Sequence, residues 1–210
     1  MADARQTLSD FTVAKNYARY LPYAKRREVY SEAVKRMMNM HRVKVAGKIA
    51  PAVLDEIEQA LIDHEILGSQ RALQFGGEAI LKTNLRRFNC TASFADRSRF
   101  FSEALWLLLC GCGVGFSVQK HHVAKLPRVL APDQPAYTHV IEDSIEGWAD
   151  ALRALMGSYF EHRMARDITG KPFPQQAVVF DGSQVRPEGS VIRSSSGRAP
   201  GPGPLLKALE

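Results

Sequence analysis

Apolar residues recur at helical spacing through the first third of the chain. Between residues 26 and 41 they form adjacent pairs one turn apart: Val29/Tyr30, Ala33/Val34 and Met37/Met38. This pattern predicts an amphipathic helix with a charged outer face. A second helix is expected from Pro51, which suits a first helical turn, to a stop by Gly68. Residues 1–67 therefore indicate a helical region that acts as scaffold.

The pattern changes to alternation at Phe88, Cys90, Ala92 and Phe94, which predicts a strand with one buried face. The next stretch, residues 99–109, is apolar on nearly all sides and predicts a helix buried between layers, ended by Gly111. A second short strand is expected over residues 114–119. Strand, buried helix and strand in this order favour a parallel pair and an α/β fold.

The remainder of the chain alternates between polar connections and short regular elements. Residues 124–142 form a long polar connection that contains three prolines. A helix with Trp148 and Leu152 on one face is expected after it, then a third strand over residues 177–180. The chain ends on an apolar stretch from Leu205 that resembles the first turn of a helix. We therefore expect that the chain has been cut short.

The composition is typical of a globular protein, but it excludes few of the functions that such a protein could have. Hydrophobic residues make up 45% of the chain and the net charge is +6, which fits anionic partners such as nucleotides. The basic residues are scattered, however, and most are expected on a solvated surface. Three cysteines without the spacing of a secreted scaffold, and no signal pattern, favour a cytoplasmic protein.

Glycines alternate at positions 111, 113 and 115, which invites comparison with a dinucleotide-binding loop. That loop needs a strand before it, a helix after it and glycine at its sixth position. Here a helix is expected before it and a strand after it, and the sixth residue is Phe116, so we reject this interpretation. Two readings remain: close approach of a ligand to exposed backbone N–H groups, or a tight turn.

The cysteines and histidines do not have the spacing of a zinc site. Cys110 and Cys112 are expected to be small buried residues, and Cys90 has the spacing of an inward residue on a strand. His121 and His122 are expected to lie on the surface or to contact phosphate. The tail from Arg193 to Pro204 either wraps an anionic ligand with its arginines or is a linker.

Five stretches in this order are far more specific than any single motif: RALQFGGEAI, RRFNCTASFADRSRFFSEALWLLLCGCGVGFSVQKHHVAKLP, IEDSIEGWADALRALM, VRPEG and SGRAPGPGPL. They resemble the N-terminal half of adenosylcobalamin-dependent (class II) ribonucleotide reductases. The resemblance implies a helical region over residues 1–67. It also implies, over residues 68–210, the first strands and helices of a ten-stranded α/β barrel.

The resemblance also implies a reaction. In this family adenosylcobalamin generates a thiyl radical on a cysteine inside the barrel, and that radical removes the 3′ hydrogen of a ribonucleotide. The 2′ hydroxyl leaves as water while a cysteine pair gives up two electrons and forms a disulfide, which a dithiol reductant such as thioredoxin later reduces. Asn89-Cys90 matches the position of one cysteine of that pair. Cys90 is therefore implied to be a redox-active reductant.

The resemblance assigns binding roles by position. Gln74 and Asn89 are implied to bind the substrate ribose or phosphate, with Cys112 and Gly113 forming the wall beside it. Three residues lie where the family binds its allosteric deoxynucleotide: Asp96, Ser117 and Lys120. Two more, Ser195 and Arg198, lie in the loop that carries specificity information from effector to substrate. No protein-bound metal is implied in this part of the family.

The resemblance implies that the family's radical cysteine, catalytic glutamate, second reductant cysteine and C-terminal cysteine pair lie beyond residue 210. Neither Cys110 nor Cys112 matches the position of the radical cysteine. The chain alone is therefore expected to be inactive and to need the C-terminal half on a second chain; self-association is a further option. An alternative is a non-catalytic nucleotide-binding or regulatory fragment that acts through a partner. A nucleic-acid binder is a third option, which the missing interleaving of aromatic and basic residues disfavours. No membrane partner is expected.

Overall fold

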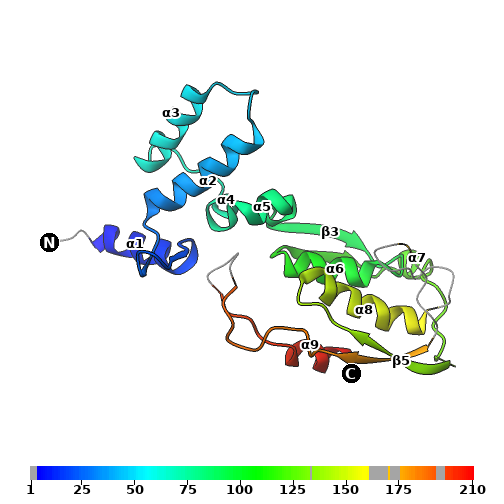
Figure 1. Cartoon of the computed structure of the whole chain (residues 1–210). Helices are drawn as coiled ribbons and strands as arrows, with labels where there is room; N and C mark the ends of the chain where they lie inside the picture. Colours follow the sequence, from blue (N-terminus) through cyan, green and yellow to red (C-terminus); the bar gives the residue numbers. More distant parts are fainter. Residues whose placement is uncertain (1–3, 133, 161–169, 171–175, 193–196) are drawn as a thin grey trace. The chain divides into compact units, whose positions relative to one another are not determined.

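The computed structural model describes residues 4–132, 134–160, 170, 176–192 and 197–210 (Figure 1). The chain divides into two compact units. Unit 1 holds the chain up to Phe88 together with Val191–Arg198, and unit 2 holds Asn89–Ser190 with Ala199–Glu210. These two units are compact groups of residues and are not the two domains that we predicted. The predicted boundary after residue 67, between a helical scaffold and a reductase domain, stays a prediction.

Unit 1 is helical apart from one small hairpin. Its elements in order are α1 (Ala4–Asn16), β1 (Tyr20–Leu21), β2 (Arg26–Arg27), α2 (Tyr30–Lys44), α3 (Pro51–Ile62), α4 (Gln70–Phe75), α5 (Glu78–Lys82) and the 3-10 helix η1 (Asn84–Arg87). The predicted helix over residues 26–41 begins later, at Tyr30, because Arg26 and Arg27 pair with the strand β1. The second helix begins at Pro51, as predicted.

Helix α2 is the centre of unit 1 and packs against α3, α4 and α5. The methionines on its inner face are at most 3% exposed, and they contact apolar residues of the three other helices. The members of this core are Val34, Met37, Met38, Met40, Leu54, Leu61, Ala72, Phe75 and Ile80. The unbranched methionine side chains fill the irregular space between short helices. The apolar pairs that predicted this helix therefore do form the core of the unit.

An exposed ion pair joins the hairpin to the first turn of α2 and makes stability depend on pH. Hydrogen bonds from Arg26 (2.7 and 2.8 Å) and from the Val29 amide (2.9 Å) lower the pKa of Glu32 from 4.5 to about 2. Because the folded state binds this proton less readily than the unfolded state, the contribution is present above pH 4.5 and is lost as the pH falls towards 2. We expect Glu32→Gln to flatten the fall in urea midpoint over that range. An unchanged slope would contradict this linkage.

Unit 2 contains two β-α-β segments. Its elements are β3 (Cys90–Phe94), α6 (Phe100–Leu109), β4 (Gly113–Ser117), α7 (Lys120–Val123), β5 (Gln134–Val140), α8 (Ile145–Tyr159), β6 (Gln176–Asp181) and α9 (Gly203–Leu209). Strands β3 and β4 pair in parallel across α6, and β5 and β6 pair in parallel across α8. The prediction of an α/β arrangement with a parallel pair is therefore confirmed. Helices α6 and α8 lie side by side (Figure 1).

Strand β5 lies inside the stretch that we predicted to be a polar connection, so that prediction is wrong for residues 134–140. The ladder between β5 and β6 shifts register between Gln134 and Tyr137. Pro135 lies in this interval, and proline cannot donate a ladder hydrogen bond, so it is tolerated in strands at irregularities of this kind. The third predicted strand is present as β6, and the predicted terminal helix is present as α9.

The face of β3 that we predicted to be buried is the uncovered one. Cys90, Ala92 and Phe94 are exposed, whereas Thr91 and Ser93 are half-buried. The reason is the position of α6: its Phe100 ring contacts Phe116 of β4 at 5.0 Å, on the side of the sheet that Thr91 and Ser93 share. On the other side His122 of α7 contacts Phe94, while Cys90 and Ala92 stay exposed among the described residues. The alternation was therefore read correctly and its direction was wrong.

Helix α6 is also more open than its sequence predicts. Phe100 and Ser102 are its buried residues, and Leu108 is 52% exposed. One side of the helix packs on β4 and α8, and the described residues do not cover the rest. The core of unit 2 forms instead around α8 and α9, from Ile141, Ala151, Val185, Leu205 and Leu209.

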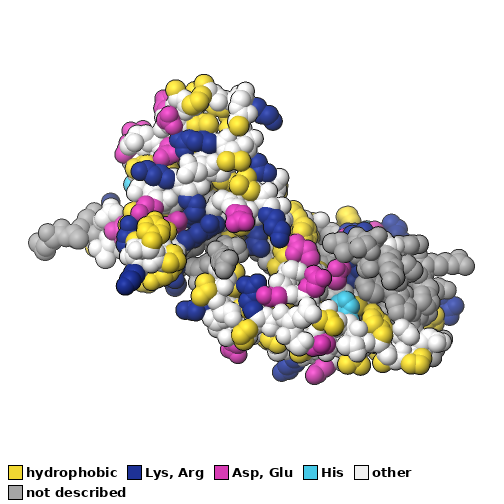
Figure 2. All heavy atoms as spheres, in the orientation of Figure 1, with side chains coloured by type: hydrophobic (Ala, Val, Ile, Leu, Met, Phe, Trp, Pro, Cys, Tyr) yellow, Lys and Arg dark blue, Asp and Glu magenta, His cyan; other side chains and the backbone are white. Residues whose placement is uncertain are grey.

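Charge is dispersed on the face shown in Figure 2, where Lys and Arg side chains lie between acidic ones rather than in one block. This agrees with the scattered basic residues of the sequence. A search of the described helices for a span long and apolar enough to cross a membrane finds none.

Candidate functional site

The uncovered side of β3 and β4 carries Cys90 at its amino-terminal end. Cys90 is paired in register with Gly113, and the Gly113 amide donates a hydrogen bond to the Asn89 carbonyl oxygen (2.8 Å). Cys90 and Asn89 are exposed. The local sequence produces this arrangement because the helix α6 returns the chain beside the strand it left. The two predicted substrate-site residues, Asn89 and Gly113, therefore lie directly beside the predicted redox thiol.

Two glycines keep the sheet open beside this thiol. A Cβ atom added to Gly113 would lie 3.9 Å from the Cys90 Cβ, and one added to Gly115 would lie 3.8 Å from the Thr91 carbonyl oxygen. Gly111, with φ of +89°, makes the turn after α6. The two readings of the glycine pattern thus apply to different positions. Gly111 serves the turn, and Gly113 and Gly115 leave the strand surface free for the close approach of a ligand.

The three cysteines are free thiols, and only Cys90 is accessible. Cys110 and Cys112 are 1% and 3% exposed, which agrees with their expected place as small buried residues. The Cys112 amide donates to the Leu107 carbonyl oxygen (3.0 Å), so the residue is part of the turn that leads into β4. Its side chain is buried, so it does not lie on the exposed side of the strand. A role of Cys112 in the substrate wall, through its backbone, stays a prediction.

The predicted effector residues gather at the opposite, carboxyl-terminal end of the same strands. Phe94 and Ser117 are paired in register, and the Ala95 amide donates to the Ser117 carbonyl oxygen (3.0 Å). Asp96 therefore follows directly on one strand, and Lys120 begins α7 after the other. Ligands of parallel α/β sheets commonly bind outside the carboxyl ends of the strands. The structure brings Asp96 and Ser117 together at such an end and leaves Lys120 exposed beside them.

His122 organises this cluster. Its Nδ1 atom lies 3.0 Å from the Ser117 Oγ atom, and its ring lies 4.5 Å from the Phe94 ring and 3.9 Å from that of His121. Partial burial, with the neighbouring His121 and Lys125, lowers the pKa of His122, while Asp96 acts in the opposite direction. His122 therefore binds a proton less readily than an ordinary histidine while its ring lies against Ser117. In the sequence, the one sign of this contact was that His122 follows Ser117 by five residues.

Asp96 is engaged by its neighbour Arg97, whose Nη1 atom lies 2.9 Å from the carboxylate. Arg97 also pairs with Glu103 of α6, and these carboxylates raise the pKa of the guanidinium, Glu103 first. The cluster therefore combines donors and acceptors of both signs. Sequence analysis placed Phe94 on the predicted strand and gave neither Phe94 nor Arg97 a role in the site.

The other predicted site residues belong to unit 1. Gln74 lies on α4, is half-buried, and accepts a hydrogen bond from Arg71 (3.4 Å). Arg198 is exposed and forms an isolated antiparallel bridge with Val191. Ser195 falls outside the described residues. Within the described ranges, no group of three or more His, Cys, Asp or Glu side chains is placed to hold a metal ion.

Comparison with known proteins points to one family. Residues 117–210 match the family described as "B12-dependent ribonucleotide reductase, insertion domain". A protein of Lacticaseibacillus paracasei named adenosylcobalamin-dependent ribonucleoside-triphosphate reductase is 25% identical over 258 residues, covering 94% of this chain and 34% of that protein. A protein of the same name from Euglena gracilis is 32% identical over 100 residues, covering 47% of this chain and 12% of its own length.

A solved structure agrees in fold. A B-12 dependent (class II) ribonucleotide reductase superposes with a TM-score of 0.70 at 22% identity, covering 95% of this chain and 35% of that one. The chain therefore spans about a third of the length of the relatives that match nearly all of it. Family model, relatives and fold converge on the resemblance carried by the sequence stretches: the chain is similar to a fragment of adenosylcobalamin-dependent (class II) ribonucleotide reductases.

Proposed function

We propose that this chain supplies part of a ribonucleotide reductase that converts ribonucleotides to deoxyribonucleotides. The observation that carries the proposal is the exposed Cys90 thiol beside the side-chain-free Gly113 at one end of β3 and β4. In the reaction, the C2′–O bond of the substrate breaks and the hydroxyl leaves as water. Two thiols each lose a hydrogen and together form a disulfide; one hydrogen ends in the water and the other in the new C2′–H bond of the product. Cys90 is one of these thiols.

The second thiol comes from outside the described chain. Cys110 and Cys112 are buried, and a disulfide needs Cα atoms about 4.4–6.8 Å apart and thiols that face one another. We infer that a second polypeptide supplies this thiol and the radical cysteine, and that it packs on the uncovered side of β3 and β4 to complete the barrel. Mixing the two polypeptides is expected to produce reductase activity that neither has alone.

Adenosylcobalamin is the cofactor in the names of the relatives. Beside Cys90, Gly113 and Gly115 of β4 carry no side chains, which leaves room for a ligand to approach the strand surface. We infer that this surface forms one wall of the cofactor and substrate space, and that most cofactor contacts lie in the rest of the reductase. When bound, adenosylcobalamin supplies the radical that converts a cysteine thiol to a thiyl.

The cluster at the other strand end is proposed to bind a deoxynucleoside triphosphate as effector. Lys120 is exposed beside Ser117 and offers an ammonium to phosphate, and hydrogen bonds to charged groups contribute about 1.5–3 kcal/mol. Lys120→Ala is therefore expected to weaken binding roughly tenfold or more in calorimetry. Lys207→Ala, an exposed lysine of α9, is the matched control. Equal losses in both variants would show nonspecific attraction and contradict an effector site.

The second candidate is a nucleotide-binding fragment without chemistry. What favours it is that the effector cluster lies within this chain, whereas the redox pair does not. Calorimetry with each deoxynucleoside triphosphate, with and without the second polypeptide, combined with a product assay, separates the two functions. Binding without any deoxyribonucleotide product in the mixture would favour the second.

A further inference from the structure

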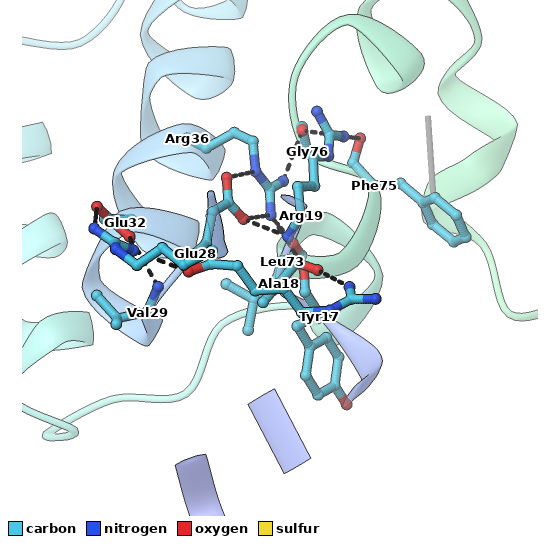
Figure 3. Close-up of polar contacts among 12 residues, drawn as sticks. Tyr17, Ala18, Arg19, Glu28, Val29, Glu32, Arg36, Leu73, Phe75 and Gly76 are labelled. Atoms are coloured by element: carbon cyan, nitrogen blue, oxygen red, sulfur yellow. Dashed lines mark hydrogen bonds and ion pairs between the residues drawn. The ribbon is translucent and has the colours of Figure 1, made fainter. Parts of the chain in front are cut away.

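Helix α4 carries Gln74 and ends against two arginines from elsewhere in unit 1 (Figure 3). Arg36 of α2 donates to the carbonyl oxygens of Leu73 (3.0 Å) and Gly76 (2.8 Å). Arg19 donates to the carbonyl oxygens of Phe75 (3.2 Å) and Gly76 (2.8 Å). The backbone is therefore held on both sides of Gln74.

A buried carboxylate sets the position of both arginines. Glu28 accepts hydrogen bonds from the Nε (2.8 Å) and Nη2 (2.9 Å) atoms of Arg36 and from the Arg19 amide (3.0 Å). The Arg36 and Glu28 side chains are 14% and 6% exposed. A planar guanidinium bound at two edges has little rotational freedom, so its remaining donors point in fixed directions. Those directions are the carbonyl oxygens of Leu73 on α4, of Gly76 directly after it, and of Tyr17 (3.3 Å).

Helix α4 depends on such contacts because it has only six residues. Isolated helices of this length are unstable, and the last four carbonyl oxygens of any helix have no partner within it. Cations near a helix C-terminus also interact favourably with its dipole. The junction has little room to adjust: a Cβ atom on Gly76 would overlap the Ala72 carbonyl oxygen and lie 3.1 Å from the Met37 Cα.

We propose that Arg36, oriented by Glu28, is a positioning residue for Gln74 in ribonucleotide binding. The inference rests on the proposed role of Gln74 as a substrate contact. Arg36 does not touch the substrate. It holds the turn of α4 that carries Gln74. Its replacement by lysine, which leaves a positive charge beside Glu28, is expected to free this turn while the helical core of unit 1 remains.

The first test measures α4 in the 210-residue chain. Arg36→Lys keeps the positive charge but cannot reach Glu28, Leu73 and Gly76 together. The Leu73 and Gly76 amides, which bond to Ser69 and Ala72, are expected to exchange hydrogen faster in this variant. Arg42→Lys is the matched control, because Arg42 also lies on α2 but pairs with Asp55 and Glu58. Faster exchange throughout α2 and α3 would indicate a general structural role and overturn the inference.

The second test couples Arg36 to Gln74 in the reductase reconstituted with its second polypeptide. Gln74→Ala and Arg36→Lys are each expected to raise the KM for ribonucleotide by up to about tenfold with kcat little changed. The double variant is expected to be no worse than Gln74→Ala, because both changes remove the same contact. Additive effects, or no effect of Arg36→Lys, would overturn this inference alone. No effect of Gln74→Ala would refute the substrate role of Gln74 and the inference with it.

Discussion

Replacing Cys90 by serine is expected to abolish steady-state nucleotide reduction in the reconstituted enzyme. A serine hydroxyl cannot form a disulfide, so one of the two electrons required for each deoxyribonucleotide has no donor. Cys90 is the accessible thiol of this chain, and its neighbours Asn89 and Gly113 form a surface that a substrate can approach. The measurement is deoxyribonucleotide formed per enzyme with a dithiol as the final reductant.

The control for this result is Cys110→Ala, because Cys110 is 1% exposed and cannot reach a substrate. Its reductase activity is expected to stay close to that of the unchanged protein, although stability falls. A thiol reagent added to the native chain should likewise modify Cys90 well before Cys110 or Cys112. Turnover that survives in Cys90→Ser would refute the assignment of Cys90 as a reductant.

Replacing Glu28 by alanine is expected to cost unit 1 about 3–5 kcal/mol of stability, the range for breaking a buried ion pair. The change leaves Arg19 and Arg36 partly buried without the carboxylate between them. Burial and the charge of Arg36 already lower the pKa of Arg19, and Glu28 opposes this shift. The loss should appear as a lower urea midpoint of the helical signal in circular dichroism and as faster hydrogen exchange in α2.

Glu32→Ala is the matched control, since Glu32 lies one turn further along and also pairs with an arginine. Its side chain is 33% exposed and that of its partner Arg26 is 48% exposed, so water and salt screen the pair. We expect a smaller fall in the urea midpoint near neutral pH than Glu28→Ala produces. Equal falls in the urea midpoint for the two variants would show that the burial of Glu28 adds no stability beyond that of an exposed ion pair.

Local pattern predicted the elements well where one physical cause dominated. Proline at the first turn marked the start of α3, and the apolar stretch before Gly111 marked α6 and its end. Pattern failed for β5, because Pro135 interrupts the ladder and resembles a loop residue. It also failed for the direction of the face with Cys90, Ala92 and Phe94, because alternation shows that a strand has two sides and not which side a helix covers.

Some features of the candidate site could be predicted from the sequence, and others could not. The position of Cys90 in the quoted stretches made it the predicted reductant, whereas its spacing alone could not separate it from a buried strand residue. Likewise, no local motif joins Glu28 and Arg36 to Gly76, which lies 40 residues beyond Arg36.

The sequence by itself determined the resemblance to class II ribonucleotide reductases, the helical first part and the parallel β-α-β order, because each follows from residues close together in the chain. Only the tertiary structure decided which of three thiols meets solvent, and which glycine makes a turn and which clears a strand surface. It alone brought two arginines and a carboxylate to the end of α4. Exposure and contact depend on residues that are distant in sequence, and a linear pattern does not contain those distances.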